Sequence, residues 1–189
     1  MAGRIGNQLS SLLEGWRATR SDRARARAYV ATLFKEPSAD EAAWLAEHGT
    51  RGDVDHARWE LRYARRALGL IAAQRDALND QTASLVARAL SAALARDPYV
   101  AAGKLRVSEQ QLNTRLRAYA DAVGNRAGAG TAWHLGRTLL RFAGRVEGAP
   151  PESVSHASDM LTGYLADANE ELLEQFGGAE LADPPAREG

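Results

Sequence analysis

The sequence has no cysteine, which excludes disulfide bonds, thiolate metal sites and cysteine nucleophiles. It has only two lysines, and it contains neither a G-x-x-x-x-G-K-[ST] loop nor a G-x-S-x-G elbow. The commonest signatures of nucleotide binding and of serine hydrolysis are therefore missing. No apolar run approaches the roughly 20 residues that span a bilayer. Aromatic residues amount to 6%, and β-branched residues are sparse, which disfavours strands.

Alanine and arginine dominate instead, and these two residues, together with leucine, are strong helix formers. Apolar residues make up 45% and charged residues 25% of the 189 residues, which are ordinary values for a globular protein. We therefore predict an all-α fold, an irregular multi-helix bundle of six to eight helices.

The strongest periodicity lies between residues 54 and 78, where apolar residues recur at alternating intervals of three and four. This spacing predicts one long, heptad-spaced central helix that is packed along its length. Arg75 stands at the one position of the series where the spacing calls for an apolar residue. An unpaired buried charge costs several kcal/mol. We expect Arg75 to mark the point where the seam reaches solvent or a partner subunit. The series consists of Val54, Ala57, Leu61, Ala64, Leu68, Ile71 and Leu78.

Several helix boundaries carry local signals. Ser38 and Glu41 have the spacing of a capping box at the start of a short helix. Gly49 is expected to close that helix in a left-handed conformation, and Asp53 to cap the next one. Ser108 is expected to cap a later helix.

Residues 40–68 are similar to a helix-turn-helix, whose second helix would enter the major groove of DNA. The segment departs from that pattern at Leu45, where an alanine is expected. Its turn is long, and Asp53 and Asp55 at the start of the second helix would repel phosphates. We interpret it as a plain αα-hairpin.

The zero net charge conceals a segregation. Residues 1–146 hold 23 Lys and Arg against 14 Asp and Glu, whereas residues 147–189 hold one arginine against ten acids. We divide the chain into a basic helical body over residues 1–147, an acidic C-terminal helix over residues 148–177 and a disordered tail over residues 178–189. We expect the acidic helix to pack on the body.

The segment RATRSDRARARAYVATLFK, residues 17–35, provides the candidate partner-binding face. At about 100° per residue, four arginines fall near one face of a helix, and Arg25 points elsewhere. This face is either solvated, or in contact with acidic groups of this chain or of a partner, or bound to phosphates of nucleic acid or membrane. The four are Arg17, Arg20, Arg23 and Arg27.

The first residues form an apolar stripe at helical spacing. We expect this helix to pack on the bundle or on a second copy, without peripheral membrane contact. The absence of a continuous apolar segment followed by small residues argues against a secretory signal, and we expect a cytoplasmic protein. The stripe consists of Ile5, Leu9, Leu12, Leu13 and Trp16.

Two groups of residues have spacings that could present metal ligands on one helix face: His56 with Glu60, and Glu152 with His156 and Asp159. Neither has the Glu-x-x-His spacing of di-iron bundles, so we interpret both as surface ion pairs. We expect no metal, cofactor or catalytic residue.

Together these features predict a non-catalytic, soluble, helical interaction protein, a subunit or adaptor in an assembly. Its partner would be another protein or a second copy of itself. The first alternative is a nucleic-acid-associated regulator that uses the N-terminal arginine face. The second is a helical enzyme or metal-binding protein.

Overall fold

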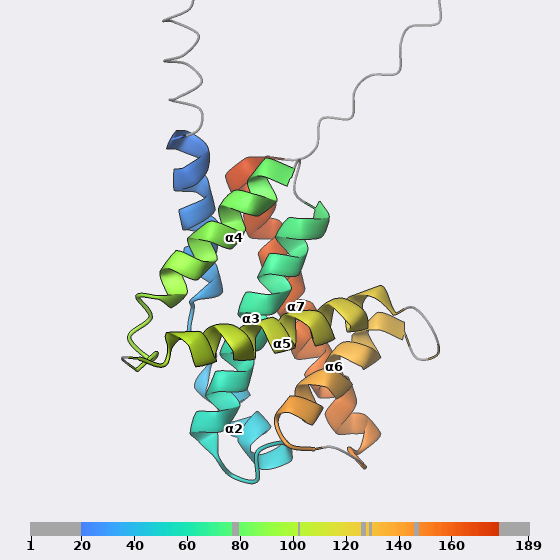
Figure 1. Ribbon diagram of the computed structural model, residues 1–189. Coiled ribbons are helices and arrows are strands. Elements are labelled where there is room, and N and C mark those ends of the chain that lie inside the picture. The colour runs from blue at the N-terminus through green and yellow to red at the C-terminus, as the bar shows by residue number, and fades with distance from the viewer. Residues whose placement is uncertain are drawn as a thin grey trace, which may run out of the picture.

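The computed structural model describes residues 20–76, 80–101, 103–125, 128, 130–145 and 148–177. These residues form seven helices and no strand, which confirms the predicted all-α bundle (Figure 1). The predicted helix over the first residues, Arg17 and the tail over 178–189 lie outside the described residues. A helix over residues 20–33 (the 20–33 helix) precedes α2 (Ala39–His48), α3 (Val54–Asp76), α4 (Asp80–Leu94), α5 (Leu105–Gly124), α6 (Gly130–Phe142) and α7 (Pro151–Phe176).

The long predicted helix is α3, and it lies at the centre of the molecule. It packs against α2, α4, α5, α6 and α7. The predicted seam is buried from Ala57 to Ile71, whereas Val54, at the first position, is 40% exposed. Arg75 lies at the solvent-exposed end of α3, where it pairs with Asp76 at 2.9 Å. Because α3 packs against five labelled helices and also contacts the 20–33 helix through Tyr29 and Leu33, it is not available as a recognition helix, and the αα-hairpin interpretation describes this segment better.

The expected caps at Ser38 and Asp53 are present. The Ser38 amide donates to a Glu41 carboxylate oxygen at 2.7 Å, and the Glu41 amide donates to Ser38 Oγ at 3.1 Å. The His56 amide donates to Asp53 Oδ1 at 2.9 Å. The prediction for Ser108 is wrong, because α5 begins one turn earlier and Ser108 is buried within it.

The prediction for Gly49 is also wrong. Its φ is −120°, and the left-handed residues of this turn are Arg51 and Gly52. A Cβ atom on Gly49 would lie 2.7 Å from the Cβ of Ala143. Glycine is needed here because the end of α2 closely approaches the chain that follows α6.

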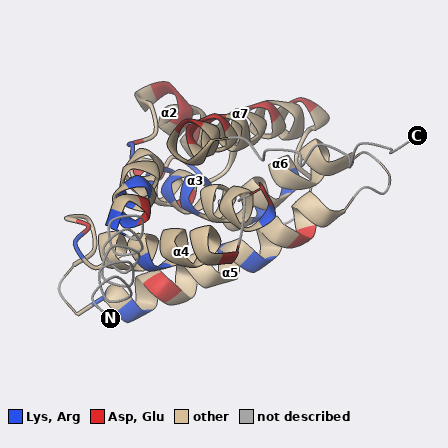
Figure 2. Ribbon diagram, turned by 90° about the horizontal axis from the view of Figure 1, so that it is seen from above, with Lys and Arg blue, Asp and Glu red and all other residues tan. Residues whose placement is uncertain are grey.

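The acidic helix α7 packs against α3 and α6. Figure 2 shows acidic residues along α7 and α2, and α7 contains no lysine or arginine. One face of α7 is buried in the core through Val154, Ala157, Leu161, Tyr164, Ala168 and Leu172.

Candidate functional site

A groove of about 650 Å³ lies between the 20–33 helix and α4. Apolar side chains from both helices form its floor, and arginines from both helices form its rim. The floor consists of Val30, Ala31, Phe34, Leu85, Ala89, Ala92 and Ala93, and the rim of Arg23, Arg27, Arg88 and Arg96. We call these residues the basic groove.

The basic groove exists because small side chains line most of α4 where it faces the 20–33 helix. A methyl group at Ala89, Ala92 or Ala93 does not fill the space between two helices. Phe34 and Leu85 add larger apolar surfaces, and both are only partly buried. The floor therefore offers apolar area for an occupant to cover.

All four rim arginines are exposed. None of the four forms an ion pair with a carboxylate of the described residues, and no acid lines the groove. Six other arginines do have carboxylate partners: Arg25, Arg58, Arg62, Arg66, Arg75 and Arg115. The basic groove thus concentrates positive charge that the fold itself leaves uncompensated.

The structure divides the predicted arginine face. Arg23 and Arg27 line the basic groove, whereas Arg20 is exposed on the same helix and does not line it. Arg25 points elsewhere, as expected, and lies 3.6 Å from Asp22. Arg17 lies outside the described residues.

Sequence reasoning missed Arg88 and Arg96, the two rim residues of α4 and of the turn that follows it. Their spacing of eight residues would place both on one helix face. The alanines between them offered a second signal, because they leave that face flat. Neither signal shows that the face lies opposite Arg23 and Arg27.

A buried ion pair lies next to Phe34 of the groove floor. Arg66 Nη2 donates to Asp97 Oδ2 at 2.6 Å, and the two side chains are only 1% and 2% exposed. Burial lowers the pKa of Arg66, and the Asp97 carboxylate opposes this effect. The Arg66 guanidinium lies 4.0 Å from the ring centroid of Phe34. This cation–π contact holds Phe34 in the floor.

The first candidate ligand pair, His56 and Glu60, belongs to another buried ion pair. Glu60 is 2% exposed and accepts from Arg115 at 2.6 and 3.0 Å, while His56 Nε2 lies 3.3 Å from its carboxylate. Arg115 therefore already occupies the Glu60 carboxylate. This corrects the interpretation of the pair as a surface ion pair, because the glutamate is inside the protein.

The second group contains His156, whose ring packs on Trp44 with centroids 4.3 Å apart. Trp44 also stacks on His48, at 4.8 Å. The described residues contain no group of three or more His, Cys, Asp or Glu that could hold a metal ion.

Comparisons with protein-family models, with curated proteins and with solved structures found no match for this chain. Within the part that the structure describes, no helix has the length and apolar character needed to cross a membrane. The geometry and charge of the basic groove are therefore the basis for a functional proposal.

Proposed function

We propose that this protein is a non-catalytic interaction protein whose basic groove binds an amphipathic helix of a partner protein. The occupant carries an apolar stripe flanked by acidic side chains. The observation that supports this proposal is the combination of an apolar floor with four rim arginines that have no carboxylate partner among the described residues.

Each part of the groove matches one part of such a helix. An apolar stripe at i, i+3, i+4 and i+7 would cover Phe34, Leu85 and the alanines of α4. Acidic side chains beside the stripe would reach the rim, where arginine can bind a carboxylate through two parallel hydrogen bonds. Nucleic acid would use the arginines but not the apolar floor, so a protein segment accounts for more of the groove.

The test uses two model peptides of about 20 residues that share a leucine stripe at helical spacing. One carries glutamate on both flanks of the stripe, and the other carries lysine at the same positions. We expect the glutamate peptide alone to bind in fluorescence anisotropy. Its affinity should fall between about 50 mM and about 500 mM salt, because salt screens exposed charges.

Three variants place the binding in the groove. R27E/R88E should abolish binding of the glutamate peptide and permit binding of the lysine peptide. A92L should weaken binding by filling the floor. The control is R106E, a reversal at an exposed arginine of α5 that does not line the groove. Equal binding of both peptides, or equal loss with R106E, would contradict the proposal.

Two other occupants give different results in the same set of variants. If a second copy fills the groove, light scattering will show a dimer that R27E/R88E converts to a monomer. If nucleic acid fills it, a single-stranded oligonucleotide will bind, lose affinity in R27E/R88E and keep its affinity in A92L. Either result would replace the proposed partner helix.

A further inference from the structure

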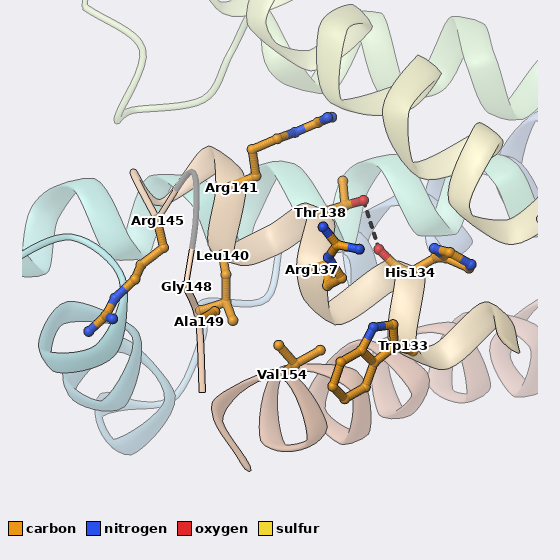
Figure 3. Close-up of a pocket in the computed structure, with 10 residues that line it drawn as sticks. All are labelled: Trp133, His134, Arg137, Thr138, Leu140, Arg141, Arg145, Gly148, Ala149 and Val154. Atoms are coloured by element: carbon orange, nitrogen blue, oxygen red, sulfur yellow. Dashed lines mark hydrogen bonds between the residues drawn. The ribbon is translucent and has the colours of Figure 1, made fainter. Parts of the chain in front are cut away.

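A second cavity, of about 460 Å³, lies between α6, the described residues Arg145, Gly148 and Ala149 that follow it, and the first turn of α7 (Figure 3). We call it the α6 pocket. Its volume falls within the range of about 300–1,000 Å³ that is usual for small-molecule sites. Trp133 and Val154 form one wall, and Figure 3 shows the indole ring beside Val154. The indole is only partly buried, so the α6 pocket offers an aromatic surface.

Arg137 and Arg141, one turn apart on α6, line the α6 pocket together with Arg145, which follows the end of the helix. None of the three forms an ion pair with a carboxylate in the described ranges. Arg145 Nε donates to the carbonyl oxygen of His48 at 2.9 Å, which positions its guanidinium while the Nη groups remain available. Figure 3 shows Arg137 next to the indole, whereas Arg141 and Arg145 point away from it, so Arg137 is the best-placed cation.

The start of α7 adds positive potential to the same place. Ala149 and Val154, which flank the first residues of α7, both line the α6 pocket. The N-cap residue Pro150 supplies no side-chain hydrogen bond to the helix. The first amides of α7 therefore lack the usual capping acceptor. The positive end of the helix dipole favours an anion nearby, and Glu152 in the first turn offsets part of this potential.

We propose that the α6 pocket binds a small anion that carries an aromatic ring. Arg137 holds the anionic group, and the ring packs against Trp133. A mononucleotide combines these two parts, because its phosphate matches guanidinium groups and its base stacks on aromatic side chains. This site shares no lining residue with the basic groove, so the proposal is independent of the proposed function.

Titration calorimetry with AMP, adenosine and ribose 5-phosphate tests both halves of the ligand. We expect AMP to bind at least about tenfold more tightly than adenosine or ribose 5-phosphate, since each of these lacks one of the two contacts. If ribose 5-phosphate binds as tightly as AMP, or if AMP does not bind, the proposal is wrong. The same holds if a single-stranded oligonucleotide binds more than about a hundredfold more tightly than AMP, because nucleic acid is then the ligand.

Two variants locate the ligand. R137Q should weaken AMP by about tenfold and leave adenosine unchanged, because only AMP carries the phosphate. W133L should weaken AMP and adenosine and leave ribose 5-phosphate unchanged. Urea unfolding verifies that each variant is folded, and W133F is the milder substitution if W133L is not. The matched control is R88Q in the basic groove, and a loss of AMP affinity in R88Q equal to that in R137Q would overturn the proposal.

Discussion

At the scale of single residues, Arg115 holds the Glu60 carboxylate in the protein interior, with Nη2 2.6 Å from Oε1. Removing Arg115 would leave the Glu60 carboxylate buried with only the His56 ring beside it, and breaking a buried pair costs about 3–5 kcal/mol. We expect R115M to lower the free energy of unfolding by this amount in urea denaturation. The double variant E60L/R115M should recover part of the loss, because no unpaired charge then remains.

The control for this pair is R106M, which removes an exposed arginine from the same helix. It should change the free energy of unfolding by less than about 0.5 kcal/mol. A loss in R115M no larger than in R106M would show that the Glu60 carboxylate is compensated by other groups.

Tyr119 is fully buried, and its hydroxyl has no hydrogen-bond partner among the described residues. Burial raises its pKa above the usual range, and it does the same for Tyr29 and Tyr164. An unfolded tyrosine ionises near pH 10, whereas the buried one stays neutral. Above that pH the unfolded state therefore binds fewer protons than the folded state, and stability must fall as pH rises.

We expect these tyrosines to leave stability unaffected below about pH 9 and to lower it progressively above about pH 10. Y119F should flatten the alkaline decline only in part, since Tyr29, Tyr63 and Tyr164, whose pKa values burial also raises, still contribute. It should also change stability at pH 7 by less than about 1 kcal/mol, because no hydrogen bond within the described residues is lost. Urea midpoints across this pH range measure both effects. Y99F is the control, because Tyr99 is 53% exposed, and an unchanged decline in Y119F would contradict the assignment.

At the scale of elements, two glycines on neighbouring helices have opposite surroundings. A Cβ atom on Gly136 of α6 would lie 2.4 Å from the Val154 carbonyl oxygen of α7, so the helices would have to separate. A Cβ atom on Gly163 of α7 would have nothing within 4 Å. The close crossing of α6 and α7 therefore depends on the first glycine and not on the second.

We expect G136A to lower the free energy of unfolding by about 1–3 kcal/mol through overpacking. G163A should raise it by about 0.5–1 kcal/mol, because alanine is the better residue in a helix interior. Chemical denaturation of both variants gives a comparison with the same chemical change on adjacent helices. A neutral G136A would show that α6 and α7 can separate without cost.

Helix boundaries were predictable where a side chain accepts a hydrogen bond from a backbone amide three residues further on, as at Ser38 and Asp53. They were not predictable where the same residue type serves a tertiary contact. Gly49 resembles a left-handed cap in the sequence, yet it is required by the approach of Ala143, 94 residues further along the chain. Local sequence carries no information about such a neighbour.

At the scale of the whole molecule, the alternation of three and four was sufficient to predict α3 as the central helix. The ion pairs around it left no comparable signal. Arg66 and Asp97 are 31 residues apart, and Glu60 and Arg115 are 55 residues apart. Pairs between distant segments have no period, so sequence reasoning made no prediction for Arg66, Asp97 or Arg115 and interpreted Glu60 as part of a surface ion pair. For the same reason, sequence reasoning identified the rim arginines of the 20–33 helix and missed Arg88 and Arg96, which come from α4 and the turn after it.

The charge segregation should be measurable although the net charge is zero. We expect the protein to bind both cation and anion exchangers at pH 7 and low salt, because α7 presents acids and the basic groove presents arginines. R23Q/R27Q/R88Q should elute earlier from the cation exchanger, and D167N/E170Q should elute earlier from the anion exchanger. If net charge alone controls retention, each variant will shift on the other column by the same amount in the opposite direction, and this result would contradict the prediction.

The rim of the basic groove consists of arginine alone, which limits how the cell could regulate it. Guanidinium groups stay protonated at every physiological pH, and lysine acetylation has no target among them. If the proposed partner helix binds in the groove, regulation of that binding would therefore have to act on the partner. Phosphorylation beside the acidic flank of the partner helix would add about −1.5 to −2 charges and strengthen binding. A model peptide compared with and without one phosphoserine at that position would reveal whether the groove responds.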